Sequence, residues 1–228
     1  MNLDLLITPN WPAPATIKAY TTLRGLEFDK SFNNWSTFQQ TLQLPNKPIL
    51  VAQKHTNIVL PAIEQNHHQI ADATFTDQPQ QICLVTTADC VPLLICNRQG
   101  SKVAAIHAGW RGLASGIIGK TIEALDLPGQ ELLVWLGPAI SQDCYEVGRD
   151  VRDSFLTADP QSIDYFKVSS DQHWMADLYG LARLQLKKLN IQQIYGGEYC
   201  TYSDSSRFYS FRRDKIHNGH MANLIWIA

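Results

Sequence analysis

The chain contains several short apolar segments separated by turn residues, and this pattern constrains its fold more than any other feature. The segments are residues 49–52, 82–85, 93–96, 103–106 and 132–136. Continuous apolar runs of this length are typical of buried strands. Several lie too close together for a helix to connect them, so hairpins must link some neighbours. We therefore expect a mixed sheet.

Two longer segments, residues 113–125 and 174–189, carry apolar residues at helical spacing, and residues 148–156 show a weaker form of the same pattern. Residues 223–227 are expected to close the core as a final strand. These elements predict a fold of the α/β or mixed α+β class, in which a mixed β-sheet core is flanked by helices. The polar residues 31–47 give no clear element.

The length and composition indicate one folding unit. With 228 residues, 45% of them hydrophobic, the chain can build one full core. It contains no internal repeat, low-complexity tract or Pro/Gly/Ser linker. We therefore predict a single domain covering residues 1–228.

The charge distribution indicates a small-molecule partner. The formal net charge is −2, and no run of Lys and Arg occurs, so binding to nucleic acid or to an anionic membrane is not expected. The N-terminus carries Asp4 and lacks the basic start and apolar core of a signal peptide. No segment approaches the roughly 18 apolar residues of a membrane-spanning helix. We expect a cytoplasmic protein.

The five cysteines do not form a disulfide framework. Their number is odd, they show no C-x-x-C spacing, and most lie in apolar runs typical of buried thiols. Cys90 differs, because Asp89 precedes it and Pro92 follows it, which places it at a turn before a strand.

Cys90 can combine with two histidines into a metal site. His55, Cys90 and His107 come from three segments and each is expected near the end of a strand, where loops converge at one edge of a sheet. A thiolate and two imidazoles form a ligand set of catalytic zinc that leaves the fourth position open. The other histidines are expected to be surface or core residues; they are His67, His68, His173, His217 and His220.

Several separated motifs occur in a definite order along nearly the whole chain. The two most specific are Ala-Asp-Cys-Val-Pro at 88–92 and His-Ala-Gly-Trp-Arg-Gly at 107–112. The others are Gln-Lys-His at 53–55, Ala-Asp-Ala at 71–73, Gly-Pro-Ala-Ile at 137–140, Cys-Tyr-Glu-Val at 144–147 and Tyr-Ser-Phe-Arg-Arg-Asp at 209–214. In this combination the chain resembles the YfiH/YlmD-like proteins, also called the multicopper polyphenol oxidase or laccase-domain family, which includes the mammalian laccase domain-containing protein 1.

The resemblance implies a single-domain α/β fold with zinc held by His55, Cys90 and His107. It also implies purine nucleoside phosphorylase activity on adenosine, inosine and 5′-methylthioadenosine, with adenosine deaminase activity besides. Copper is the less favoured metal, because a multi-copper array needs many histidine ligands and this chain has seven, without His-x-His pairs. Polyphenol oxidation is therefore not expected. The substrates would be a nucleoside and phosphate, and the protein a monomer or homodimer.

Several residues near the metal motifs are candidates for catalysis and substrate binding. Arg111 and Arg24 are candidates for binding phosphate, and Trp110 and Tyr145 for stacking on a purine. Cys90, His107, Arg111 and Asp89 are the candidate catalytic residues. Each has a structural alternative: an arginine commonly forms a surface ion pair, an aromatic ring commonly packs in a core, and Asp89 can orient the Cys90 loop instead of moving protons.

Two other functions remain open from the sequence. One is a metal-assisted or thiol hydrolase acting on an amide such as a peptidoglycan precursor, with Cys90 as nucleophile and His107 as its base. The other is a non-catalytic protein whose zinc only fixes loops, although such a site would need a fourth protein ligand. The chain also departs from the family pattern, because residues 25–29 lack the usual double glycine and Gly219-His220 stands where Gly-Arg is common.

Overall fold

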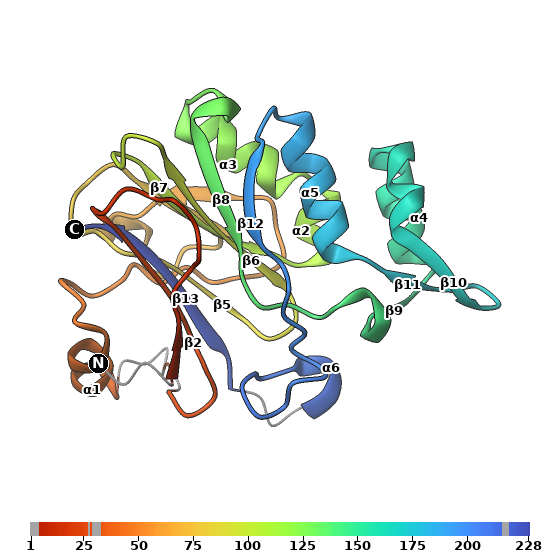
Figure 1. Cartoon of the computed structure of the whole chain (residues 1–228), viewed down its shortest axis with the longest axis horizontal. Coiled ribbons are helices and arrows are strands. Elements are labelled where there is room, and N and C mark those ends of the chain that lie inside the picture. The colour runs from red at the N-terminus through yellow and green to blue at the C-terminus, as the bar shows by residue number, and fades with distance from the viewer. Residues whose placement is uncertain (1–4, 27, 29–32, 216–218) are drawn as a thin grey trace.

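The computed structural model describes residues 5–26, 28, 33–215 and 219–228. His217, the four N-terminal residues, two residues of the 25–29 segment and the start of the polar 31–47 segment lie outside the described part. The fold is a mixed α+β arrangement with helices flanking mixed sheets, as the sequence predicts (Figure 1).

The central sheet has six strands in the order β12-β8-β6-β7-β4-β3. β8, β6, β7 and β4 pair in antiparallel fashion, whereas β12 and β3 join the two edges in parallel. The prediction of a mixed sheet is therefore confirmed. The strands are β3 (Val59–Pro61), β4 (Ala73–Thr76), β6 (Val91–Asn97), β7 (Val103–Ala108), β8 (Leu132–Leu136) and β12 (Gln193–Gly196).

Two smaller sheets complete the strand structure. A four-stranded antiparallel sheet has the order β1-β2-β13-β5 and includes the predicted C-terminal strand. A three-stranded sheet has the order β10-β11-β9. Their strands are β1 (Leu6–Ile7), β2 (Ile17–Thr22), β5 (Cys83–Thr87) and β13 (Met221–Ile227), then β9 (Glu146–Gly148), β10 (Phe166–Ser170) and β11 (His173–Ala176).

The apolar runs are continuous because the central strands are buried on both faces. In β6, Leu93 and Ile95 pack with the helices, whereas Leu94 and Cys96 pack against the four-stranded sheet. Successive side chains of a strand point to opposite faces, so a strand between two layers must be apolar at every position. The outer face of the four-stranded sheet is covered in turn by α1 (Trp35–Leu42), through Phe38 and other buried residues.

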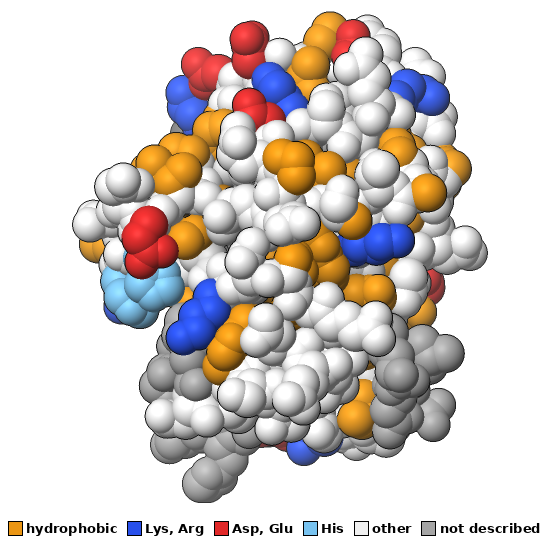
Figure 2. Space-filling view, turned by 90° about the vertical axis from the view of Figure 1, so that its left-hand side faces the viewer, with side chains coloured by type: hydrophobic (Ala, Val, Ile, Leu, Met, Phe, Trp, Pro, Cys, Tyr) orange, Lys and Arg blue, Asp and Glu red, His pale blue; other side chains and the backbone are white. Residues whose placement is uncertain are grey.

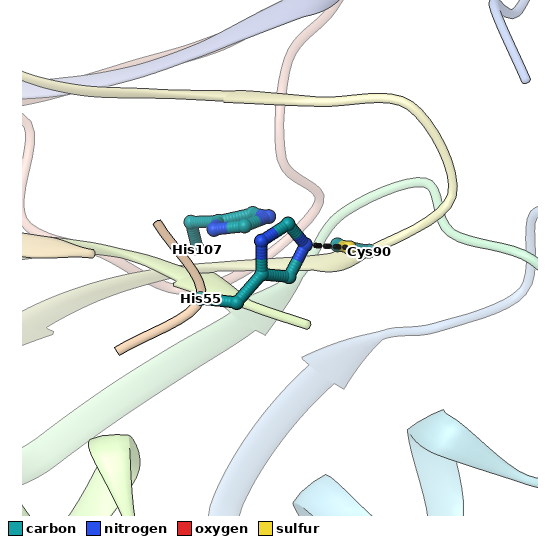
Figure 3. Close-up of side chains that lie close together, drawn as sticks. All are labelled: His55, Cys90 and His107. Carbon is teal, nitrogen blue, oxygen red and sulfur yellow. Dashed lines mark hydrogen bonds between the residues drawn. The ribbon is translucent and has the colours of Figure 1, made fainter. Parts of the chain in front are cut away.

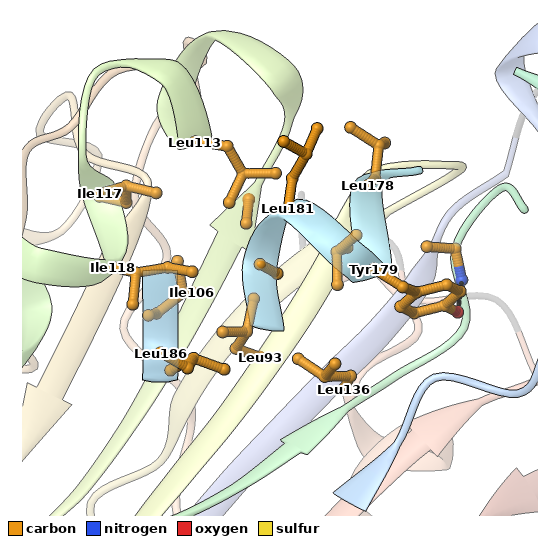
Figure 4. Packing of buried hydrophobic residues seen from close by; sticks show 14 of the residues in the cluster. Leu93, Ile106, Leu113, Ile117, Ile118, Leu136, Leu178, Tyr179, Leu181 and Leu186 are labelled. Carbon is orange, nitrogen blue, oxygen red and sulfur yellow. Dashed lines mark hydrogen bonds between the residues drawn. The ribbon is translucent and has the colours of Figure 1, made fainter. Parts of the chain in front are cut away.

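Helices cover the remaining face of the central sheet (Figure 1). Leu113 of α2, Ile117 and Ile118 of α3, and Leu181 of α5 pack onto Ile106 and its strand neighbours (Figure 4). The side chain of Asp177 accepts a hydrogen bond from the Gly180 amide and caps the start of α5. The helices are α2 (Trp110–Ala114), α3 (Ile117–Leu125), α4 (Arg149–Ala158), α5 (Leu178–Lys188) and α6 (Phe211–Asp214).

Three predicted elements differ in the structure. Residues 113–125 do not form one helix, because Gly116 adopts a left-handed φ of 86° and separates α2 from α3. Residues 174–176 belong to β11, and the helix begins only after Asp177. Residues 49–52 form isolated bridges at Ile49 and Ala52 instead of a strand. The polar segment that gave no clear element contains α1.

The distribution of charged side chains on the surface is consistent with the low net charge. On the face drawn in Figure 2, the described Lys and Arg side chains lie apart from one another, and acidic side chains lie among them. No continuous basic patch is visible there. None of the described helices has the length and apolar character needed to cross a lipid bilayer.

Candidate metal centre

The structure brings His55, Cys90 and His107 together (Figure 3). Their potential ligand atoms all lie within 4.8 Å of one another. His107 lies in β7, Cys90 immediately precedes β6, and β6 and β7 are antiparallel neighbours in the central sheet. His55 comes from the preceding loop, with a left-handed φ of 60°, and not from the end of a strand as predicted. Three separate segments therefore supply one cluster.

The three side chains differ in exposure, which gives the cluster an open side. His107 is buried, Cys90 is partly buried and His55 is exposed. The His55 Nε2 atom lies 3.7 Å from the Cys90 Sγ atom, and the His55 and His107 rings meet edge to face at 4.7 Å between centroids. A small molecule can therefore approach from the His55 side.

Asp72 fixes the orientation of His107. The buried His107 ring donates from Nδ1 to the Asp72 carboxylate over 2.7 Å. This bond leaves the opposite ring nitrogen, Nε2, facing the cluster, where it can bind a metal that displaces its proton. A carboxylate behind a ligating histidine is the common arrangement at zinc sites. The Ala-Asp-Ala motif contained this residue, but the sequence alone gave it no role.

Asp72 also holds the loop that carries His55. Its carboxylate accepts hydrogen bonds from the backbone amides of Lys54, His55 and Thr56 and from the Thr56 hydroxyl, at 2.6 to 3.2 Å. One fully buried carboxylate thus organises two of the three cluster residues. This support also explains how His55 keeps its left-handed backbone conformation, which is unfavourable for most residues.

Gly109 leaves the space in which the cluster forms. A Cβ atom at this position would lie 2.5 Å from Cδ2 of His55 and 3.0 Å from Sγ of Cys90. Neither distance is compatible with the present side-chain positions. The glycine of the His-Ala-Gly-Trp-Arg-Gly motif is therefore a requirement of packing at the site.

Asp89 positions the Cys90 turn. Its backbone has a φ of 95°, its carbonyl accepts from the Ile140 amide, and its carboxylate accepts from the Thr201 hydroxyl and the Arg212 amide at 2.6 and 2.7 Å. Both carboxylate oxygens therefore have a partner within the protein. These contacts favour the orienting role for Asp89 over proton transfer.

The cluster has strongly coupled charges. Burial raises the pKa of the Cys90 thiol, but the adjacent His107 and His55 rings outweigh this effect and lower it to about 6. Burial lowers the pKa of His107, whereas the Cys90 thiolate and Asp72 raise it to about 9. Burial raises the pKa of Asp72, but hydrogen bonds from His107 and Thr56 hold it at about 2. A negative thiolate is thus favoured at neutral pH, the form that binds metals.

The residues present fit a zinc ion. Sulfur and imidazole nitrogen are preferred zinc donors, and three protein ligands leave a fourth position open for catalysis. Within the part of the chain that the structure describes, His55, Cys90 and His107 form the one group of three or more His, Cys, Asp or Glu side chains close enough to share an ion. A multi-copper array would need several such groups, so this donor set favours a single metal.

Two aromatic side chains predicted for the site, Tyr145 and Trp110, each have an arginine over the ring. The Arg212 guanidinium lies 5.0 Å from the centre of the Tyr145 ring, and Arg111 stacks on Trp110 at 4.3 Å. Burial raises the pKa of Tyr145; of the nearby charges, Cys90 raises it further, whereas Arg212 and Arg111 lower it. Tyr145 therefore lies within electrostatic range of the Cys90 thiol and of both arginines. The sequence had suggested Arg111, Trp110 and Tyr145, but not Arg212.

Arg24 is engaged elsewhere. Its guanidinium forms an ion pair with Asp214 over 2.9 Å, bonds the Phe208 carbonyl and lies over the Tyr209 ring. These contacts connect the end of β2 to α6. Arg24 thus forms the surface ion pair that is common for an arginine, and phosphate binding by Arg24 stays a prediction.

Comparison with known proteins identifies the family. A sequence model of the family described as multi-copper polyphenol oxidoreductase laccase matches residues 29–228. The chain belongs to this family. The YfiH-type relatives include a Pseudomonas aeruginosa protein named purine nucleoside phosphorylase, which is 39% identical and aligns over 99% of both chains. Escherichia coli YfiH, also named purine nucleoside phosphorylase, is 36% identical over 99% of this chain and 100% of the relative.

A solved structure supports the same placement. The crystal structure of a Neisseria meningitidis protein superposes with a TM-score of 0.90 at 39% sequence identity, covering 98% of this chain and 99% of the other. The fold of this chain is therefore that of the YfiH family. The resemblance seen in the sequence motifs is confirmed across nearly the whole chain.

Proposed function

We propose that this protein is a zinc-dependent purine nucleoside phosphorylase that acts on adenosine, inosine and 5′-methylthioadenosine and also deaminates adenosine. The observation that carries the proposal is the convergence of His55, Cys90 and His107, with the Tyr145 ring, over which Arg212 lies, within electrostatic range of Cys90. The names of the Pseudomonas and Escherichia relatives support the reaction class. A zinc ion held by the three residues would supply Lewis-acid chemistry to a substrate oxygen or attacking water.

Phosphorolysis needs an anion site next to a nucleoside site. A phosphate oxygen attacks C1′ of the ribose, the bond between C1′ and the purine breaks, and the purine leaves with the bonding electron pair. Arg111 and Arg212 are exposed cations that both act electrostatically on Tyr145, and they can bind phosphate oxygens. Tyr145 is partly exposed and offers a ring face for the purine.

His107 and Asp72 serve positioning roles in this proposal. The carboxylate holds the imidazole, and the imidazole in turn presents Nε2 to the metal position. Asp89 does the same for Cys90 through the backbone of its turn. A rigid set of donors keeps the metal position fixed relative to the Arg111 and Tyr145 wall, as catalysis by positioning requires.

The experiment is product analysis with adenosine and inosine. Zinc-loaded protein is incubated with each nucleoside, with and without phosphate, and the products are separated by chromatography. Phosphate-dependent release of adenine or hypoxanthine supports phosphorolysis, and inosine formed from adenosine supports deamination. Neither product from a metal-loaded, folded protein would overturn the proposal.

Variants test whether the activity depends on the His55, Cys90 and His107 cluster. Cys90→Ser and His55→Ala are expected to abolish product formation. His173→Ala is the matched control, because His173 is exposed and bonds only the Asp171 carbonyl among the contacts seen. Retained activity in Cys90→Ser would remove the cluster from the reaction.

One observation favours a second candidate function, an amide hydrolase. The Cys90 sulfur and a His55 ring nitrogen lie 3.7 Å apart, as in a nucleophile and base pair. The two functions differ in their response to metal removal. Hydrolysis of a peptidoglycan-type amide that persists after chelation and stops with Cys90→Ser would establish the thiol mechanism.

A further inference from the structure

A second pair of cysteines lies beside the metal centre. Cys144 ends the short 3₁₀ turn Gln142–Cys144, and Cys200 forms an isolated parallel bridge with Ala139. Burial raises the pKa of the Cys144 thiol, and Ser141 and Cys200 also act on it. Ser141 in turn donates to the Cys200 sulfur from its hydroxyl over 3.0 Å and from its backbone amide over 3.5 Å. Ser141 directly precedes the Gln142–Cys144 turn and therefore brings this turn, with its Cys144 thiol, against the Cys200 sulfur.

This pair differs from the core cysteines in exposure and in acidity. Cys83 and Cys96 are fully buried, and burial raises the pKa of each to about 12. Cys144 and Cys200 are both partly exposed. Burial raises the pKa of Cys200, but hydrogen bonds from Ser141 and Ser203 outweigh it and lower the value to about 7. An accessible thiolate beside a second thiol is the arrangement of a redox-active cysteine pair.

Both cysteines are directly connected to the site. Cys144 is followed by Tyr145, whose ring lies under Arg212 and within electrostatic range of Cys90. Cys200 is followed by Thr201, whose hydroxyl holds the Asp89 carboxylate at 2.6 Å. A movement of either sulfur therefore moves a residue next to the metal centre or its substrate wall.

We propose that Cys144 and Cys200 form a reversible disulfide that lowers the activity of the adjacent site. The oxidant is a low-molecular-weight disulfide such as oxidised glutathione. The Cys200 thiolate attacks one sulfur of the oxidant, and one glutathione thiolate leaves. The Cys144 thiol then loses its proton and attacks the mixed disulfide, which releases the second glutathione thiolate. Two protein thiols are oxidised and one oxidant disulfide is reduced to two thiols.

The expected effect on activity follows from geometry. A covalent bond requires the two sulfur atoms to approach to about 2.05 Å, closer than a hydrogen bond allows. The turn carrying Tyr145 and the segment carrying Thr201 must then shift toward each other. Because a displacement of about 1 Å can cost a site up to about 100-fold, we expect kcat/KM to fall on the order of tenfold. The bond itself does not depend on the proposed function, whereas this effect on turnover rests on it.

Peptide mapping tests the bond without reference to activity. Zinc-loaded protein is equilibrated with oxidised and reduced glutathione at a series of ratios, free thiols are blocked, and the protein is digested with trypsin. Cys144 and Cys200 fall in separate peptides, residues 121–149 and 189–207, while the other three cysteines share residues 55–98. We expect the first two peptides to become joined, with loss of the mass of two hydrogen atoms, and to separate on reduction.

Activity on nucleoside is measured on the same samples. Oxidation is expected to lower kcat/KM in the wild type and in Cys83→Ser, a control at a buried cysteine, and to have no effect in Cys144→Ser or Cys200→Ser. A joined pair with unchanged kcat/KM would overturn the regulatory part of the proposal. The absence of a joined peptide at oxidising glutathione ratios, or a link from residues 55–98, would overturn the pair itself. An enzyme without nucleoside activity that still forms the joined peptide would reject the proposed function and retain the disulfide.

Discussion

The Asp72 carboxylate accepts a hydrogen bond from Nδ1 of His107 over 2.7 Å, and both side chains are buried. The bond determines which ring nitrogen of His107 faces Cys90 and His55. The same carboxylate accepts from three successive backbone amides in the His55 loop. Through these contacts Asp72 brings a strand residue, His107, and a loop residue, His55, into one candidate metal centre.

Asp72→Asn should weaken metal binding. An asparagine keeps the volume but offers a single acceptor oxygen and no negative charge, so His107 and the 54–56 loop lose part of their support. We expect zinc affinity to fall about 10- to 100-fold, the usual range for a carboxylate behind a ligating histidine. Competition with a chromogenic chelator measures it. Asp77→Asn, at an exposed residue paired with Gln78, is the control, and equal affinities for the two variants would contradict the assignment.

Two glycine substitutions distinguish a loss of metal binding from a change in overall stability. Gly109→Ala places a methyl group against His55 and Cys90, so metal binding and activity should be lost. Gly119→Ala lies within α3, where an added Cβ meets no atom within 4 Å. It should raise the free energy of unfolding by about 0.5–1 kcal/mol and leave metal binding unchanged. Thermal melts and metal titrations of both variants check the pair, and normal zinc binding by Gly109→Ala would be inconsistent with the site.

Metal should protect Cys90 from alkylation. A zinc-bound thiolate is shielded, whereas a free thiolate with a lowered pKa reacts rapidly. After chelation, iodoacetamide should modify Cys90 within the 55–98 peptide while the buried Cys83 and Cys96 stay unmodified. Fragmentation mass spectrometry locates the label. Equal labelling of Cys90 with and without zinc would show that the thiol is not a ligand.

The strands and the three cluster residues were predictable because each depends on a local signal. A strand between two apolar layers is apolar throughout, so β5, β6, β7 and β8 appear directly in the sequence. Residues 49–52 carry the same pattern without becoming a strand, because their β-pairing is limited to isolated bridges of Ile49 with Cys83 and of Ala52 with Ile70. An apolar run indicates that a segment is buried, whereas a strand forms only where a neighbouring strand pairs with the segment over several residues.

The supporting residues depend on contacts between distant segments. Asp72 acts on His107 and on the 54–56 loop, and Arg212 reaches Tyr145 from α6. No spacing rule connects these positions in the sequence. The break at Gly116 could have been suspected from the glycine itself, since a glycine in a helical pattern often marks an interruption.

Arg111 should control phosphate binding. In the proposed reaction, Arg111→Ala removes a cation from the anion site, so KM for phosphate should rise about tenfold or more, the loss expected for a hydrogen bond to a charged group. KM for the nucleoside should change less. Arg98→Ala is the control, because Arg98 follows β6 at the end opposite Cys90 and bonds Gln130. Initial rates at varied phosphate check the prediction, and an unchanged phosphate KM would remove Arg111 from the anion site.

Cys200 should become reactive at a lower pH than an ordinary cysteine. Hydrogen bonds from Ser141 and Ser203 stabilise its thiolate and lower its pKa to about 7, against burial. The titratable neighbours Cys144 and Tyr179 are both neutral at this pH, because burial raises their pKa values. Since the thiolate is the reactive form, the alkylation rate should rise between about pH 6 and 8 instead of around 9.

Substitution of Ser141 tests the cause of the lowered pKa of Cys200. Ser141→Ala removes the hydroxyl donor, so the midpoint of the Cys200 alkylation profile should move to higher pH. Ser154→Ala, which removes a hydroxyl bonded only to the Asp150 carbonyl of its own helix among the contacts seen, should leave the midpoint in place. The rate is followed by labelling of the 189–207 peptide across a pH series. A wild-type midpoint near 9, or the same midpoint in Ser141→Ala, would show that the serine does not activate Cys200.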